Sequence, residues 1–277
     1  MKNILLPTDF SDNSHNAIQY AMELFRGTQT CFHFLNVHKA GEFVLDNLMT
    51  AAPGSSLHQA VLKDSKKQLQ EFVAHFKEVY RSENFEFKLF VDYDTLTHSV
   101  EQMIRHEAID LIVMGTNGAT GAGEVLFGSN TLHIIRNIDS PLLVIPQNYN
   151  YKPIGSVVFT ARKCKDVRDE RAEPLIELLR STGAELHILK IKGNETSKQT
   201  HNCGACLVDA LAGLNHTSHT LTGVPEHFAV SAFIQLNNPG LHAMFVERES
   251  FLDRFFHGNC TAKISLGTHI PLLVLHK

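Results

Sequence analysis

The stretch that decides the fold is residues 111–131, which read LIVMGTNGATGAGEVLFGSNT. It begins with an apolar run typical of a buried strand and continues with glycines in the spacing G-x2-G-x9-G-S. We expect Gly115 to end the strand, Gly118 to adopt a positive φ and Gly128 to open a helix. The segment therefore predicts a strand, a glycine-rich loop and a helix in succession.

The predicted helix N-terminus gives this loop a chemical role. Ser129 or Asn130 can cap the helix, whose first backbone N–H groups lack partners within the helix. Those N–H groups and the positive end of the helix dipole attract anions. The loop is therefore expected to hold a phosphate chain without the help of a lysine.

Length and composition limit the class of protein. A chain of 277 residues with 43% hydrophobic content can form two ordinary domains. No uninterrupted apolar run approaches the ~18 residues of a membrane span, and the apolar stretch at the N-terminus is too short for a signal peptide. Five cysteines without a regular framework favour a reducing compartment. We therefore expect a cytoplasmic protein.

The charge is unevenly distributed. A net charge of −4 argues against a strongly basic nucleic-acid binder. Residues 1–150 carry 11 Lys and Arg against 17 Asp and Glu, whereas the remainder carries 14 against 12. The phosphate loop lies in the acidic half, so backbone N–H groups and a divalent cation such as Mg²⁺ are expected to hold a bound polyanion.

The chain repeats itself. Residues 23–26 and 32–37 recur at 177–180 and 186–191, an offset of 154, and residues 128–131 and 141–144 recur at 258–261 and 271–274, an offset of 130. Two copies of one fold explain both offsets if the second copy is shorter. We expect domains at residues 1–148 and 154–277, joined by a polar linker.

Strands and helices alternate within the first copy. Apolar patterns predict strands at residues 3–7, 31–37, 85–91, 111–115 and 142–145, and helices at 11–25, 69–80, 97–106 and 130–137. Near-continuous apolar strands that alternate with helices indicate a parallel sheet covered on both faces. We predict two tandem doubly wound α/β domains, each with a five-stranded parallel sheet.

With its glycine pattern, the segment from Met114 to Pro146 resembles the universal stress proteins, a family of adenine-nucleotide binders. The resemblance implies that the Asp9 carboxylate contacts adenosine and that the backbone at Val37 and Met114 meets adenine. The residues it implies for the whole site are Pro7, Thr8, Asp9, Val37, Met114, Gly115, Gly118, Gly128, Ser129, Asn130 and Thr131. The implied ligand is ATP, AMP or ADP, with Mg²⁺ expected alongside the triphosphate.

The second copy departs from this pattern. Its equivalents of Pro7, Asp9, Gly115 and Gly118 are Thr160, Arg162, Phe245 and Arg248. A phenylalanine and an arginine in place of two glycines fill the loop and stiffen it. We therefore expect one nucleotide site, in the first copy.

The resemblance also implies a mode of assembly and a role. Family members pair through the last strand of each sheet, so residues 142–145 and 272–275 are expected to meet within one chain as a pseudo-dimer; a homodimer stays open. The implied role is regulation of the stress response by nucleotide occupancy. The alternative is a nucleotide-independent interaction protein whose second domain binds a ligand or a metal.

Cysteines and histidines in the second copy raise that alternative. Cys203, Cys206, His216 and His219 have the spacing C-x2-C-x9-H-x2-H, which suits tetrahedral zinc. Against zinc, residues 216–222 look like a strand, on which positions three apart face opposite ways. No thioredoxin-like context supports a redox role, so free thiols are the expectation.

Other enzyme classes lack their motifs. The sequence has no G-x4-G-K-[ST] phosphate loop and no G-x-S-x-G nucleophile elbow. No base paired with a nucleophile lies near the glycine loop. We assign no catalytic residue and expect at most a slow ATPase.

Overall fold

The computed structural model describes residues 1–38, 57–116, 128–161, 170–192, 211, 213–246 and 269–277. They form two compact units, residues 1–115 and 116–277, each considered by itself. The boundary between these units comes from residue packing and differs from the boundary of the predicted repeat. The two repeated domains, residues 1–148 and 154–277, stay a prediction.

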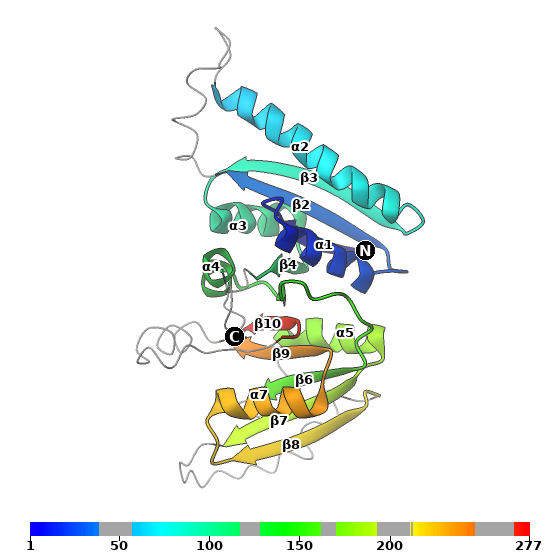
Figure 1. Ribbon diagram of the computed structural model, residues 1–277, viewed down its shortest axis with the longest axis vertical. Coiled ribbons are helices and arrows are strands. Elements are labelled where there is room, and N and C mark those ends of the chain that lie inside the picture. The colour runs from blue at the N-terminus through cyan, green and yellow to red at the C-terminus, as the bar shows by residue number, and fades with distance from the viewer. Residues whose placement is uncertain (39–56, 117–127, 162–169, 193–210, 212, 247–268) are drawn as a thin grey trace. The chain divides into compact units, whose positions relative to one another are not determined.

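The first unit is a four-stranded parallel sheet with three helices (Figure 1). Its elements are β1 (Lys2–Pro7), α1 (Asp12–Leu24), β2 (Thr30–His38), α2 (Leu57–Val79), β3 (Phe85–Tyr93), α3 (Leu96–Glu107) and β4 (Leu111–Gly115). The strand order is β3-β2-β1-β4, so the chain first runs to one side of β1 and then returns to the other. A switch point therefore lies between β1 and β4.

The second unit contains six strands in the order β5-β10-β9-β6-β7-β8. Its elements are α4 (Ser129–Asn137), β5 (Leu142–Ile145), β6 (Ser156–Ala161), the 3-10 turn η2 (Glu170–Ala172), α5 (Glu173–Thr182), β7 (Glu185–Lys192), β8 (His216–Thr222), α7 (Glu226–Asn237), β9 (Leu241–Val246) and β10 (Leu272–His276). The order β8-β7-β6-β9 has the same pattern as β3-β2-β1-β4. The predicted α/β fold class is confirmed.

Strand β5 pairs antiparallel with β10, whereas the other described ladders of this unit are parallel. Leu143 lies opposite Leu273, and the ladder extends one residue to each side. The contact expected between these two strands is therefore present. Each strand covers an edge that the other would leave exposed.

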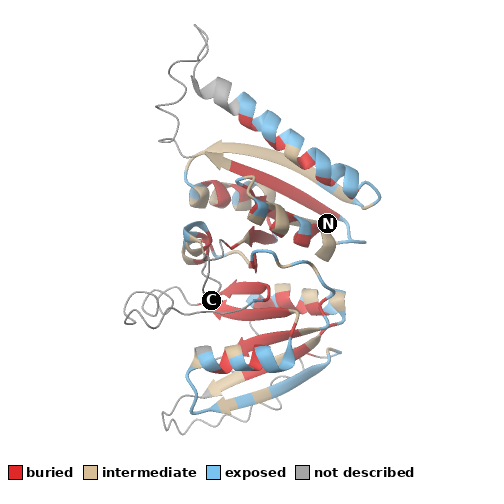
Figure 2. Cartoon of the chain, viewed as in Figure 1, coloured by how far each residue is buried: buried red, intermediate tan, exposed pale blue. Residues whose placement is uncertain are grey.

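Burial explains why the central strands are apolar. In β2, the seven residues from Thr30 to Asn36 are all buried, so both faces of the strand are covered. In β8 the pattern is mostly exposed, as expected for an edge strand (Figure 2). Parallel sheets with helices on both faces require continuous hydrophobic strands of the β2 kind.

Helix α1 shows how local sequence sets an element boundary. Ser11 is the N-cap, with extended backbone angles, and its side chain accepts a hydrogen bond from the Ser14 amide. Ala17, Ile18 and Ala21 form part of its buried face. The helix therefore begins where the sequence predicted, directly after the end of β1.

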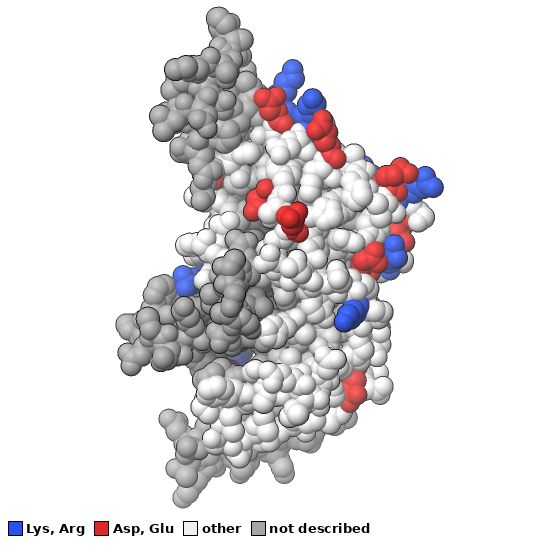
Figure 3. Space-filling model, in the orientation of Figure 1, with Lys and Arg blue, Asp and Glu red and all other residues white. Residues whose placement is uncertain are grey.

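Charged side chains lie at the surface of the first unit in pairs of opposite sign (Figure 3). Examples are Lys67 with Glu71 at 3.8 Å and Arg81 with Glu78 at 2.9 Å. Exposed ion pairs of this kind contribute only about 0–1 kcal/mol each. The stability of the unit therefore depends on its buried apolar residues.

In the second unit, Leu273→Ala should lower the free energy of unfolding by about 2–5 kcal/mol, because Leu273 is 2% exposed and its truncation leaves a cavity. Leu236→Ala is the matched control: Leu236 is 84% exposed, and its change should stay within about 0.5 kcal/mol. Urea unfolding of both variants measures the difference. Equal midpoints would contradict the burial of β10.

Candidate functional site

Six of the predicted site residues lie at one edge of the first unit. Pro7 ends β1, and Thr8 and Asp9 follow it directly. Val37 is next to last in β2, while Met114 and Gly115 end β4. These strands are parallel neighbours, so their carboxyl ends share an edge, and the β1–β4 switch point lies there. The structure thus brings these six residues to the place where doubly wound sheets bind ligands.

Asp9 is an exposed carboxylate with a fixed orientation. Its Oδ1 accepts hydrogen bonds from the Ser11 amide at 3.1 Å and the Ser11 hydroxyl at 2.5 Å. Burial acts to raise the pKa of Asp9, but hydrogen bonds, those from Ser11 foremost, hold it below its ordinary value. Asp9 therefore carries its negative charge at neutral pH. It does not cap α1, since Ser11 does so.

Thr8 anchors the turn that carries Asp9. Its amide donates to the Leu35 carbonyl at 2.9 Å, and its own carbonyl accepts from Asn36 Nδ2 at 2.8 Å. Its buried hydroxyl lies 3.0 Å from Ser14 Oγ. Bonds to both β2 and α1 thus fix the backbone directly before the carboxylate.

Phe10 adopts a backbone conformation that the sequence did not predict. Its φ is +63°, in the left-handed region that large side chains rarely occupy. The Phe10 amide bonds Thr8 Oγ1 at 3.0 Å, and its ring packs edge-on against Phe72 of α2 at 5.3 Å. Residues held in such conformations tend to cluster at functional sites, where the surrounding structure compensates their strain.

Gly115 is required by a close approach to α1. A Cβ atom added at Gly115 would lie 2.7 Å from the backbone oxygen of Asn13 and 2.9 Å from its Nδ2. Real Cβ contacts are not this short, so only glycine fits without a shift. Sequence reasoning expected the glycine to permit a turn and missed Asn13. The Asn13 side chain therefore belongs to this edge of the sheet.

The remaining predicted site residues do not belong to the first unit. Gly118 lies outside the described residues, and Gly128, Ser129, Asn130 and Thr131 lie in the second unit, at the N-terminus of α4. The expectation that Ser129 or Asn130 caps α4 is wrong. Gly128 is the N-cap, and α4 has no side-chain capping bond. Ser129 already has helical geometry, so it belongs to the first turn.

Aromatic and ionisable side chains at the ends of β2 and β3 extend the edge. The rings of His38 and Tyr93 stack, with centroids 5.4 Å apart and planes 27° apart. One turn into α3, His98 Nδ1 pairs with the Asp94 carboxylate. That hydrogen bond, chiefly, raises the pKa of His98, and it also lowers the pKa of Asp94. No motif signalled either pair: His38 and Tyr93 meet because β2 and β3 are neighbours, whereas Asp94 and His98 are a local pair four residues apart.

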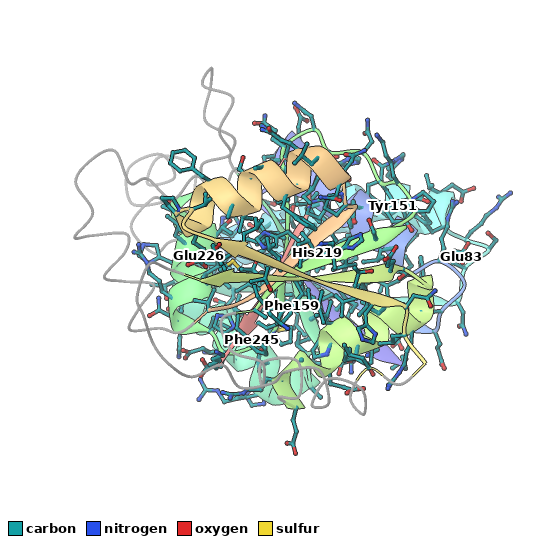
Figure 4. The ribbon with its side chains drawn as sticks, turned by 90° about the horizontal axis from the view of Figure 1, so that it is seen from below. Glu83, Tyr151, Phe159, His219, Glu226 and Phe245 are labelled. Carbon is teal, nitrogen blue, oxygen red and sulfur yellow. The ribbon has the colours of Figure 1, made fainter. Side chains whose placement is uncertain are left out.

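The equivalent edge of the second unit is packed with side chains. Phe245, the counterpart of Gly115, is buried, and its ring meets Phe159 edge-on at 5.9 Å (Figure 4 labels both residues). Thr160, the counterpart of Pro7, lies 2.9 Å from Nε2 of His242, and burial lowers the pKa of His242 to about 4. Bulky and buried groups thus stand where the first unit has a glycine and a turn.

Of the four suggested zinc ligands, the two described ones have different partners. Cys203 and Cys206 lie outside the described residues. His216 and His219 are both on β8, the strand predicted for residues 216–222. His216 Nδ1 lies 3.0 Å from the Leu214 carbonyl oxygen, whereas His219 Nε2 lies 3.4 Å from His187. The objection that the two histidines face opposite ways is therefore supported.

His33 is a structural side chain in the core of the first unit. It is fully buried, with Nε2 3.2 Å from Asn3 Oδ1 and Nδ1 3.6 Å from Glu107 Oε2. Burial lowers its pKa, followed by the charge of Lys88. These contacts give it a packing role. No described helix is long and apolar enough to cross a membrane.

The contact between Gly115 and Asn13 generates a prediction. Gly115→Ala should lower the free energy of unfolding by about 1–3 kcal/mol, because the backbone oxygen of Asn13 cannot easily move away. Gly155→Ala is the control, since its Cβ would meet nothing within 4 Å. Denaturant unfolding compares the two. A Gly115→Ala protein as stable as the control would show that the close approach is absent.

The pairing of Asp94 and His98 generates a second prediction. The pKa of His98 should lie above its ordinary value near 6.5, and Asp94→Asn should return it toward that value. Because the folded-state pKa is raised, the stabilisation that comes from protonated His98 is lost as pH rises through that pKa. NMR titration of the histidine ring measures it, with Asp64→Asn as a control. An unchanged pKa in Asp94→Asn would contradict the pairing.

Comparisons of the sequence with known proteins point to one family. The model of the universal stress protein family matches residues 1–146. The universal stress protein MJ0577 of Methanocaldococcus jannaschii is 22% identical over 156 residues, which cover 52% of this chain and 94% of that protein. MJ0531 of the same organism is 26% identical over 146 residues, covering 52% and 81%.

Solved structures show the same fold over the whole chain. A universal stress protein from Archaeoglobus fulgidus aligns over 99% of this chain and 98% of its own, with a TM-score of 0.73 and 19% identity. A putative universal stress protein from Pseudomonas aeruginosa covers 99% and 93%, with a TM-score of 0.59 and 15% identity. At these identities the structural likeness speaks for the fold alone. Since the family model matches more than half of the sequence, the chain belongs to the universal stress protein family.

Proposed function

We propose that the first half of the chain binds ATP, or AMP or ADP, and that nucleotide occupancy regulates a partner in the stress response. The observation that carries the proposal is the convergence of Asp9, Val37 and Gly115 at the carboxyl edge of β1, β2 and β4. An adenosine needs apolar contacts, backbone partners and a hydrogen-bond acceptor for its ribose hydroxyls. The residues at this edge include groups of all three kinds.

Asp9 is suited to the ribose. Its carboxylate remains ionised at neutral pH, and two hydrogen bonds from Ser11 to Oδ1 fix its direction. A carboxylate that accepts hydroxyl protons forms charge-assisted hydrogen bonds, which are stronger than neutral ones. In the proposal, Pro7 and Thr8 hold the turn in place while Asp9 contacts the sugar.

In the proposal, main-chain groups of the protein bind both the adenine base and the phosphates. Val37 is half-buried and Met114 is buried, so each can contribute apolar surface and a main-chain partner for adenine. The phosphate part of the proposal rests on the sequence motif, with Gly115, Gly118 and the first turn of α4 as donors. The lack of a side-chain cap on α4 supports it, because capping would use an amide that a phosphate needs.

Magnesium fits the charge of this half. Residues 1–150 carry more acidic than basic side chains, so bulk positive charge does not neutralise a triphosphate there. A divalent cation bound with the phosphates supplies the missing charge. We propose that the protein binds ATP and hydrolyses it slowly at most. Nucleotide occupancy would change the conformation of the glycine-rich loop, and that change would signal to the partner.

Asp9→Asn should weaken ATP binding roughly tenfold to a hundredfold, because a hydrogen bond to a charged group contributes about 1.5–3 kcal/mol. The amide oxygen of asparagine can still accept the bonds from Ser11, so the turn should stay folded. Asp12→Asn is the control, since Asp12 lies in the first turn of α1. Isothermal titration calorimetry with ATP and Mg²⁺ measures all three proteins.

Two further results decide the proposal. Gly118→Phe should weaken ATP more than adenosine, since it obstructs only the phosphate loop. Equal ATP affinity in wild type, Asp9→Asn and Asp12→Asn would exclude Asp9 from the site. Absence of ATP binding to the wild-type chain would reject the proposed function as a whole.

A further inference from the structure

Two histidines meet on neighbouring strands of the second unit, away from the edge that corresponds to the nucleotide site. His187 is on β7 and His219 on β8, and the register pairs His187 with Thr217, two residues before His219. The side chains therefore share one face of the sheet, next to α7, where Figure 4 labels His219. Phe233 of α7 lies against both rings, with centroids 5.9 and 4.8 Å away.

The distance between the two rings is that of a ligand pair. His219 Nε2 lies 3.4 Å from His187 Nδ1. Zinc binds imidazole nitrogen at 2.0–2.1 Å, so two nitrogens at the tetrahedral angle are about 3.4 Å apart. We infer that His187 and His219 form a binding site for a divalent transition metal ion of the zinc type.

A carboxylate stands beside the pair. Glu185 Oε1 lies 3.9 Å from His187 Nδ1 and accepts a hydrogen bond from Thr217 Oγ1 at 2.8 Å. Its negative charge favours a cation at this position. The same nitrogen of His187 thus faces both a second imidazole and an acid.

The hydrogen between the two rings must move when a metal binds. Only a ring nitrogen without a hydrogen can donate its lone pair to a metal. The two facing nitrogens, 3.4 Å apart, share one hydrogen in the free protein. When a metal ion takes its place, that hydrogen moves to the other nitrogen of its own ring or to water.

The first unit shows how unusual this pair is. At the sequence offset of 154, His187 corresponds to His33, and the strand registers place His219 where the first unit has Phe90. His33 stacks on Phe90 at 5.8 Å and is fully buried. The second unit has a histidine in place of that phenylalanine, and the His187 side chain retains 14% exposure. Compared with the first unit, the second unit therefore has an additional imidazole, His219, at the Phe90 position. Its other imidazole, His187, is partly exposed, whereas His33 is fully buried.

The described residues supply only part of the coordination shell. Among them, no group of three or more His, Cys, Asp or Glu side chains is placed to hold a metal. In the inferred site, water or an external ligand takes the remaining positions, and the ion should exchange readily. Imidazole pairs suit zinc, nickel and copper rather than magnesium or calcium. This site is independent of the proposed nucleotide site.

Calorimetric titration of the full chain with zinc chloride tests the inference. The proteins compared are wild type, His187→Gln, His219→Gln and, as the matched control, His216→Gln. His216 is on the same strand but bonds the Leu214 carbonyl instead of His187. Loss of an outer partner of a metal ligand weakens binding 10–100-fold, so loss of a ligand should weaken one zinc event by roughly tenfold or more.

The pattern across variants separates the outcomes. A zinc event weakened in both His187→Gln and His219→Gln but kept in His216→Gln supports the site. Equal titrations in all four proteins would overturn it. A zinc event that persists in the two pair variants and disappears only in Cys203→Ser would also overturn it, since the cysteines would then hold the ion.

Discussion

The burial of both faces of the central strands is the constraint on which the rest of the structure depends. β2 has seven consecutive buried residues, and β9 is buried throughout. Unpaired polar groups cannot be placed along such strands without a large cost in free energy, so polar side chains within them must be satisfied locally. His33 meets this demand at Nε2, which lies 3.2 Å from Asn3 Oδ1. The side chains that we propose as ligand-binding groups accordingly lie at strand ends, on the edge strand β8 and on β7 beside it.

That constraint also explains how much of the fold could be predicted. Continuous apolar runs marked β4 and β5 to the residue, because buried strands leave a clear pattern. Helix α2 was predicted only from residue 69, whereas it begins at Leu57. The polar run at residues 63–68, KDSKKQ, interrupts the apolar spacing that was followed from residue 69. The helix continues through this run to Leu57.

The candidate site likewise contains residues whose positions the sequence could predict and residues whose positions it could not. Asp9 and Gly115 could be assigned from sequence because a chemical motif and a strand end coincided there. The role of Asn13 could not, since its approach to Gly115 joins elements about a hundred residues apart and uses a side chain with no motif. The N-cap of α4 was misplaced by one residue because serine is the better capping residue by propensity, yet Gly128 occupies the position.

The two halves have different side chains at equivalent positions of the same strand order. At the strand end where the first unit packs Gly115 against Asn13, the second unit has Phe245, whose ring meets Phe159. On the neighbouring strands, where His33 stacks on a phenylalanine, His187 meets His219. One half thus keeps backbone groups at its ligand edge and an apolar partner for its histidine. The other closes that edge and places two imidazoles near solvent, so a metal there and a nucleotide in the first half require no shared residue.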